Sequence, residues 1–367
     1  MRAAKLSLVA LVACLPEVDA PITGGPCPAP PEVELEVPPD ESFAHVIDKL
    51  ESKEPLLLEG HQWDHTLVRD CVMSEVEGDA IRLKDVHDVW IVGCVFERGT
   101  GGIRLLAAGG TSSVTIARNR FHQLRGMSVA ILEAEGVEHR GARVIGNRFE
   151  SVGLAGTQGR SPAILAVARD YLLEANSICE PQGGDGIHAG GPGLISRNFI
   201  RNAKRSAIRY IPPEAGFPGP GGRLEVVNNI AVGLFGSSTY AILGGGPGVA
   251  DAVFSFNTGV HFSSRDAVLS IQEGAPKVSA FGNLWVHTLD VENTVAGALE
   301  KDEANYKQAA LEGFVSDVNP IDLHLGPSHP ALGAAGTLAH PGFDFDGDPR
   351  PGASGRSDPG ADQTRFE

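Results

Sequence analysis

Apolar and polar residues alternate in two short phrases that recur along most of the chain. The first phrase is an apolar residue, two variable residues, an Asn, any residue and another apolar residue, as in residues 116–121 (Ile-Ala-Arg-Asn-Arg-Phe). The second phrase lies in the gaps and joins a small residue to an aliphatic one, as in Ala207 and Ile208. The Asn position of the first phrase is held by Cys in two early copies, and it recurs at Cys71, Cys94, Asn119, Asn147, Asn176, Asn198, Asn229, Asn257 and Asn283.

These repeats predict a parallel β-helix. Two short alternating strands per repeat cannot bury an apolar face alone, but stacked copies can. The intervals of 22 to 31 residues between successive Asn positions are too irregular for an array of helical repeats. We therefore expect an all-β, single-stranded solenoid of about nine coils over residues 61–290, in which the Asn side chains form a ladder of amide hydrogen bonds.

Both ends of the solenoid need a cover. Residues 40–60 are predicted to form an N-terminal capping helix, because a polar cluster precedes Phe43, Val46, Ile47 and Leu50, which share one helical face. A helical stretch near residues 298–313 and an irregular C-terminal cap over residues 291–367 are expected to close the other end.

The C-terminal cap carries the most specific motif of the chain. It contains Asp-Leu-His-Leu at residues 322–325, Ser-His-Pro-Ala at 328–331, and two Asp-rich turns near Arg350 and Ala361. These residues resemble the closing segment of exported bacterial right-handed parallel β-helix proteins of the choice-of-anchor Q type, which are relatives of the pectate-lyase-like superfamily. His329 interrupts the Ser-Pro-Ala step, and Gln363 stands where those proteins have an acidic residue. The resemblance implies a right-handed coil and an exported protein. It implies no particular reaction, because function on this fold depends on the side chains that it carries.

The first residues predict a targeting segment. Arg2 and Lys5 precede a short apolar stretch that ends on Cys14 in a sequence similar to the bacterial lipobox. Residues 1–13 are then a signal peptide, Cys14 is lipidated, and residues 14–39 form a Pro-rich linker or tether. The alternative is ordinary secretory cleavage after Ala20. We expect a monomeric lipoprotein of the cell envelope that meets the membrane only through its lipid, or else a secreted protein.

Composition narrows the class of partner. A hydrophobic content of 42% excludes a disordered chain, and the net charge of -16 argues against nucleic acid as the partner. The acidic excess lies near the two ends of the chain, whereas one run of thirteen residues in the middle holds five cations and no acid. This run predicts an anionic partner, a uronate-bearing or sulfated glycan. The alternative is that these are solvated arginines that balance neighbouring acids. The members of the run are Arg197, Arg201, Lys204, Arg205 and Arg209.

Few cysteines remain beyond the proposed lipidation site. Cys27, Cys71, Cys94 and Cys179 are too few for a disulfide framework in a protein of this size. Cys71 and Cys94 occupy adjacent ladder positions, so the sequence leaves open whether they form a disulfide or two buried thiols.

The second phrase also predicts a candidate catalytic site. The residue after the aliphatic position should point outward, and the resulting column brings His188 and Arg209 together on adjacent coils. Lyases of the superfamily that the cap resembles use Arg or Lys to remove the proton alpha to a uronate. By that analogy Arg209 or Lys204 is the base and His188, polarised by Asp185, is a proton donor. The full column reads Arg82, Arg104, Leu132, Leu165, His188, Arg209, Leu243 and Leu269, and the candidate substrate-binding residues are Arg197, Arg201, Arg205, Tyr210 and Glu214.

No cofactor is predicted, with calcium as the alternative. Asp344, Asp346 and Asp348 alternate as carboxylates in a calcium loop do, but the sixth and twelfth positions of that loop are Pro349 and Gly355. We expect these aspartates to cap turns and to pair with Arg350.

Two functions from different classes remain open. One is a polysaccharide-active enzyme, a lyase rather than a hydrolase, which the basic run favours. The other is a non-catalytic surface module that binds glycan or serves adhesion. The leucines of the outward column favour this second function, because a sugar cleft normally presents polar groups.

Overall fold

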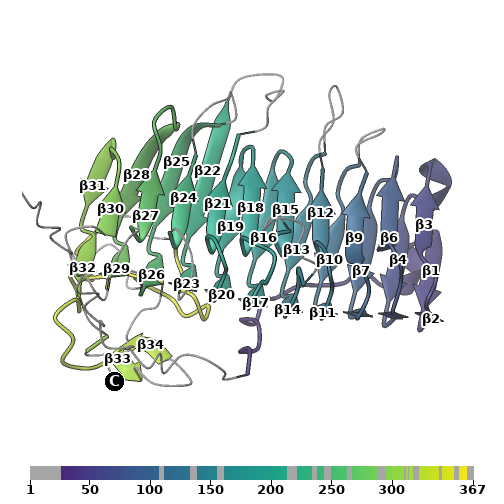
Figure 1. Cartoon of the computed structure of the whole chain (residues 1–367), viewed down its shortest axis with the longest axis horizontal. Helices are drawn as coiled ribbons and strands as arrows, with labels where there is room; N and C mark the ends of the chain where they lie inside the picture. Colours follow the sequence, from purple (N-terminus) through teal and green to yellow (C-terminus); the bar gives the residue numbers. More distant parts are fainter. Residues whose placement is uncertain are drawn as a thin grey trace, which may run out of the picture.

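The structure is a computed structural model of the whole chain (Figure 1). It describes residues 26–106, 111–132, 139–154, 161–212, 221–233, 238–243, 249–262, 267–287, 294–309, 311–312, 314–316, 322–338, 341–350 and 355–361. The predicted signal peptide and Cys14 lie outside the described residues. Within the described residues, no helix has both the length and the apolar character needed to cross a membrane.

The chain forms a stack of coils, each contributing one strand to each of three parallel sheets. Sheet A contains β1 (His45–Asp48), β4 (Thr66–Arg69), β7 (Val89–Val92), β10 (Thr115–Ala117), β13 (Arg143–Ile145), β16 (Tyr171–Glu174), β19 (Gly193–Ser196), β22 (Gly222–Val227), β25 (Val249–Ser255), β28 (Lys277–Phe281) and β31 (Lys301–Glu303). Sheet B contains β2 (Glu51–Ser52), β5 (Val72–Ser74), β8 (Val95–Glu97), β11 (Arg120–His122), β14 (Arg148–Glu150), β17 (Ser177–Cys179), β20 (Phe199–Arg201), β23 (Ile230–Gly233), β26 (Thr258–His261), β29 (Leu284–His287) and β32 (Tyr306–Gln308).

Sheet C is the face that carries the second phrase of the repeat. It contains β3 (Leu56–Glu59), β6 (Asp79–Lys84), β9 (Gly101–Leu105), β12 (Val129–Ile131), β15 (Ile164–Val167), β18 (Ile187–Gly190), β21 (Ile208–Tyr210), β24 (Tyr240–Ile242), β27 (Leu269–Ile271) and β30 (Val295–Ala296). The predicted fold class, a parallel β-helix, is confirmed. The expected nine coils are close to the eleven, eleven and ten strands of the three sheets, and each coil has three strands rather than two.

The first phrase spans a corner of the coil. Its apolar residues belong to different sheets, so that Ile116 lies in β10 and Phe121 in β11, with Asn119 between them. The residue before each ladder position has a positive φ, and this left-handed residue turns the chain from sheet A to sheet B. These corner residues are Asp70, Gly93, Arg118, Gly146, Ala175, Arg197, Asn228, Phe256, Gly282 and Ala304.

A buried column of asparagines runs along this corner. The Asn176 side chain donates from Nδ2 to the carbonyl of Val144 at 2.8 Å and to Asn198 Oδ1 at 2.9 Å, and Asn198 Oδ1 also accepts the backbone N–H of Asn176 at 3.0 Å. The same pattern repeats from Asn119 to Asn305 and confirms the predicted ladder. It satisfies amides that no water reaches.

The thiols of Cys71 and Cys94 continue the column without a disulfide. Both are buried and free, and the Cys71 backbone N–H lies 3.4 Å from Cys94 Sγ. Cys94 joins the amide ladder through its own N–H, which donates to Asn119 Oδ1 at 2.8 Å.

The predicted N-terminal capping helix is wrong. Residues 40–60 contain the short 3₁₀ turn η1 (Asp40–Ser42) and then β1, β2 and β3, and a second turn, η2 (His61–Trp63), follows. Ile47 packs against the core while Val46 is exposed, which is the alternation of a strand. Pairing of β1 with β4 therefore outweighs the helical periodicity and makes these residues a strand. The helix expected near residues 298–313 is likewise replaced by β31 and β32.

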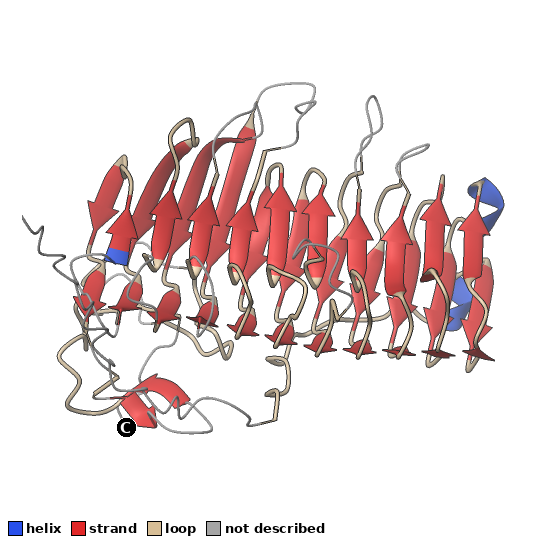
Figure 2. Ribbon diagram, in the orientation of Figure 1, coloured by secondary structure: helices blue, strands red, loops and turns tan. Residues whose placement is uncertain are grey.

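The C-terminal segment covers a side of the rod (Figure 2). A hairpin of β33 (Phe314–Ser316) and β34 (Asp322–Leu325), with Ala331 and Ala361, packs on the outer face of sheet B in the last coils. Arg350 fixes the segment, because it donates to the carbonyls of Gly360 and Ala361 at 2.8 and 3.0 Å and lies 4.4 Å over the Phe256 ring.

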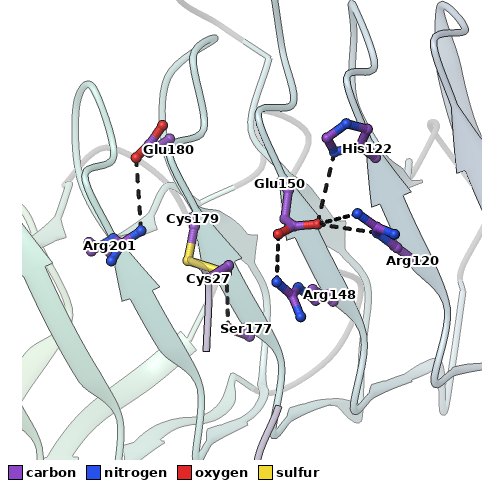
Figure 3. The surroundings of a disulfide bond; sticks show 9 residues. All are labelled: Cys27, Arg120, His122, Arg148, Glu150, Ser177, Cys179, Glu180 and Arg201. Atoms are coloured by element: carbon purple, nitrogen blue, oxygen red, sulfur yellow. Dashed lines mark hydrogen bonds and ion pairs between the residues drawn. A yellow bond between two sulfur atoms is a disulfide. The ribbon is translucent and has the colours of Figure 1, made fainter. Parts of the chain in front are cut away.

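Residues 26–39, here called the N-terminal strap, are fastened to the coils rather than free as a linker. Cys27 forms a disulfide with Cys179 of β17 (Figure 3). Leu35 is buried against Ala117 and Ile145. The Arg118 guanidinium donates to the carbonyl of Leu35 at 3.2 Å.

The ladder should dominate stability. We expect Asn198→Ala to lower the free energy of unfolding by about 3 kcal/mol or more, because an unsatisfied buried polar group costs ~1–3 kcal/mol and this change orphans several. Asn305→Ala, at the partly exposed last rung, is the matched control and should cost about 1 kcal/mol or less. Urea unfolding of both variants measures the difference, and equal losses would contradict the ladder's role.

The disulfide should stabilise the strap. Replacing Cys27 and Cys179 together by Ser removes a cross-link between residues 152 apart and should cost about 2–5 kcal/mol. Thermal unfolding with and without a reductant provides the control. Reductant should lower the wild-type midpoint to that of the double variant and leave the variant unchanged; a variant as stable as the oxidised wild type would refute this.

Candidate functional site

The run of five cations winds around the coil instead of forming one patch. Arg197 lies at the corner between sheets A and B, Arg201 ends β20 in sheet B, and Lys204 and Arg205 lie in the turn toward sheet C. Only Arg209, in β21, lies on sheet C itself. Residues consecutive in sequence therefore point to different sides of the rod.

Two of the predicted substrate-binding arginines have structural partners. Arg197 is buried and donates to the backbone carbonyls of Phe345 and Glu32, each at 2.9 Å, so that it joins the C-terminal segment to the N-terminal strap. Arg201 is also buried, and its guanidinium lies 3.8 Å from Glu180 on the sheet B side (Figure 3). Neither presents its charge beside Arg209.

Tyr210 was expected to bind substrate and instead belongs to the core. It follows the outward Arg209 in β21 and points inward, where it is fully buried. Burial raises the pKa of its hydroxyl to about 12. Glu214, the remaining candidate, lies outside the described residues.

The outward column of sheet C has a different composition from the predicted one. Register places Ala130 beside Arg104, and Ala241 beside Arg209. Leu132 and Leu243 lie two residues further along the chain, and Leu269 is buried in the core. β12 and β24 each have two inward apolar positions, and the prediction aligned the second, Ile131 or Ile242, where the register aligns Val129 or Tyr240. The observed column is Arg82, Arg104, Ala130, Leu165, His188, Arg209, Ala241 and Ser270.

Asp185, His188 and Arg209 meet on this face and form what we call the Asp185 cluster. Arg209 Nε lies 3.1 Å from Asp185 Oδ1, and His188 Nδ1 lies 3.6 Å from Asp185 Oδ2. The backbone N–H of Ser206 donates to the same Oδ1 at 3.1 Å. Asp185 is thus held by both coils, and the predicted neighbours are brought together.

The local sequence explains why the two coils approach closely at Asp185. At Gly186 a Cβ would lie 2.6 Å from Ile200 Cγ2 and 2.7 Å from the carbonyl of Ala207, so only glycine lets the chain pass this close to the next coil. Pairing of His188 with Arg209 in the register of β18 and β21 then sets the two side chains over the carboxylate.

The cluster combines buried and accessible groups. The side chains of Asp185 and Arg209 are 3% and 7% exposed, whereas that of His188 is 23% exposed. Burial lowers the pKa of Arg209, the Asp185 carboxylate opposes this shift, and the charge of Arg205 adds to it. The charge of Arg205 therefore contributes to the electrostatics of the Asp185 cluster. Lys204 is exposed in the same turn.

A second cluster on sheet C was missed by the sequence analysis. Asp79 Oδ2 lies 3.3 Å from Nε of both Arg82 and Arg104. The Asp-x-x-cation spacing of Asp79 with Arg82 equals that of Asp185 with His188, and this spacing is the signal that would have found it.

Within the described parts of the chain, no group of three or more His, Cys, Asp or Glu side chains is arranged to hold a metal. Asp344 caps its turn, since its Oδ1 accepts the backbone N–H of Asp348 at 2.8 Å. Asp346 Oδ2 lies 3.2 Å from His324 Nε2.

Neither a protein-family model nor a curated protein sequence matches the chain. Among solved structures, an alginate lyase from Paenibacillus sp. strain FPU-7 is 11% identical with a TM-score of 0.45 over 72% of this chain and 98% of its own. The pectate lyase Pel9A is 10% identical with a TM-score of 0.46 over 88% and 87%. Tailspike protein 3 of bacteriophage CBA120 is 11% identical with a TM-score of 0.24 over 71% and 50%.

Breaking the buried ion pair should destabilise the protein. Asp185→Asn keeps the shape but leaves Arg209 without its counter-charge, and we expect a loss of about 3–5 kcal/mol. Asp251→Asn is the matched control, because its pair with Arg223 is exposed and 3.8 Å long and should contribute less than ~1 kcal/mol. Urea unfolding compares them; similar losses in the two variants would show that the Asp185 pair is not a buried structural contact.

Proposed function

We propose that the protein binds an acidic polysaccharide on the outer face of sheet C and cleaves it by β-elimination at the Asp185 cluster. The observation that carries this proposal is a buried carboxylate that joins a fixed guanidinium to an accessible imidazole on the neighbouring coil. A histidine can take up and return a proton near neutral pH, and an arginine can hold the carboxylate of a uronate.

The chemistry assigns one role to each group. His188 Nδ1 faces Asp185, which leaves Nε2 to remove the proton from the carbon alpha to the uronate carboxylate. The electron pair of that C–H bond forms a C=C bond as the adjacent glycosidic C–O bond breaks, and the departing oxygen takes a proton; no water is added across the bond. Arg209 stays protonated and neutralises the charge that develops on the carboxylate.

Analogy with lyases of the superfamily gives a different assignment, with Arg209 or Lys204 as the base and His188 as the proton donor. The low exposure of Arg209 and its ion pair with Asp185 favour the histidine. Lys204 and Arg205 in the adjoining turn would meet other charges of the bound chain.

A non-catalytic binding module is the second candidate. It is favoured by the same low exposure, because a sugar chain that lies on this face reaches His188 but only the edge of Asp185 and Arg209. Binding without cleavage is then the expected behaviour.

Export belongs to the proposal as well. The Cys27–Cys179 disulfide supports it, since disulfides persist in oxidising compartments. With the predicted signal segment, we propose an exported monomer that is anchored through a lipid on Cys14 or secreted after cleavage at Ala20.

The test is the absorbance of unsaturated products from a panel of uronate-containing polysaccharides, with sulfated and neutral ones beside them. The chain should be made from residue 21 onward in an oxidising compartment, past both cleavage sites and with Cys27 retained. We expect His188→Ala to lower the rate about 10²–10⁴-fold. Arg223→Ala, an exposed arginine on sheet A, should leave it unchanged.

Each outcome decides between the candidates. Binding without unsaturated product, and without new reducing ends, would establish the binding module. A His188→Ala variant as active as wild type, with activity lost in Lys204→Ala, would move the base to Lys204. No binding to any acidic polysaccharide would remove the proposed function altogether.

A further inference from the structure

We propose that Asp79, Arg82 and Arg104, here called the Asp79 cluster, form a second anion-binding subsite, so that sheet C binds one extended polyanion at two charged points. This inference rests on the proposed function and adds to it a defined substrate length and direction. The chain of the ligand would run along the axis of the rod, across the strands.

The Asp79 cluster repeats the geometry of the Asp185 cluster. In each, an Asp precedes the aliphatic position by two residues, a cation follows that position on the same coil, and a second cation occupies the aligned position of the next coil. Register pairs Arg82 with Arg104 as it pairs His188 with Arg209. The two clusters therefore place one carboxylate and two basic side chains at the same register positions of one face, with two guanidiniums in the Asp79 cluster and a guanidinium and an imidazole in the Asp185 cluster.

Charge and access favour anion binding at the Asp79 cluster. Two guanidiniums share one carboxylate, so one positive charge is left over. The side chains of Arg82 and Arg104 are 41% and 32% exposed, which makes them far more accessible than Arg209. Gly101 provides the space for this arrangement, because a Cβ there would lie 2.7 Å from Asp79 Oδ1.

The spacing selects an extended ligand. Between the clusters, the aligned positions of the two intervening coils are Ala130 and Leu165, which carry no charge. Stacked strands are ~4.8 Å apart, so three steps separate Arg104 from His188 by about 14 Å. A monosaccharide or a short oligomer reaches one cluster, whereas a longer uronate chain reaches both and gains affinity from the second contact.

The experiment measures the affinity of uronate oligomers of increasing length by calorimetry. The variant combines Arg82→Gln and Arg104→Gln, and we expect it to lose about tenfold or more in affinity for long oligomers while the shortest oligomer that binds wild type is unaffected. The affinity of the double variant for long oligomers should also depend less on salt concentration, because fewer ionic contacts form.

The chain offers a matched control on another sheet. Arg120 and Arg148 share Glu150 on sheet B, at 3.1 and 2.7 Å, and also lie on adjacent coils (Figure 3). Arg120→Gln with Arg148→Gln removes the same charge and should leave binding of long oligomers unchanged. If the double variant does not fold, the Arg82→Gln single variant, which changes the more exposed of the two arginines, tests the same loss of affinity for long oligomers.

The possible failures are distinguishable. Wild type that binds no oligomer of any length overturns the proposed function and this inference with it. Wild type that binds or cleaves acidic oligomers, but shows no length preference or keeps it in the double variant, overturns the second subsite alone. An equal loss in the sheet B control would also overturn it, because the effect would then follow net charge.

Discussion

The buried amide column is the constraint on which the rest of the structure depends. Each Asn rung accepts the backbone N–H of the rung before it and donates to a backbone carbonyl of the preceding coil, so the hydrogen bonds form only when consecutive coils keep the same phase. The same alignment of coils fixes which residues are neighbours on sheet C. An acid on one coil meets a cation on the next at Asp185 and Arg209, and again at Asp79 and Arg104, because the ladder keeps the coils in register although the loops between strands vary in length.

The sequence revealed the ladder because the column demands one side chain at one depth in every coil. The helices predicted near the two ends of the rod were wrong for a related reason. In residues 43–50 the apolar positions follow a helical period, and pairing with the next coil overrides it by leaving Val46 exposed. The helix expected near residues 298–313 likewise concealed Asn305, whose place as a further rung appears once residues 301–308 are strands.

The site was only partly predictable. His188 and Arg209 were found because both a local spacing and a column point to them, whereas Arg197, Arg201 and Tyr210 were grouped with them by closeness in sequence alone. A coil turns through three sheets within some two dozen residues, so neighbours along the chain face different ways. The Cys27–Cys179 bond had no sequence signal, because its partners are 152 residues apart and meet only after the strap lies across the coils.

The contacts of Arg197 impose an order on assembly. Its guanidinium binds a carbonyl of the strap and a carbonyl of the C-terminal segment, and the strap's cysteine bonds to a coil near the middle of the rod. The strap therefore lacks its docking surface until the coils that carry Cys179 and Arg197 exist, and the bond from Arg197 to the C-terminal segment forms only when Phe345 is in place. A β-helix can otherwise grow coil by coil from its first turn. Here, docking of the C-terminal segment is the event that joins it to the strap through Arg197.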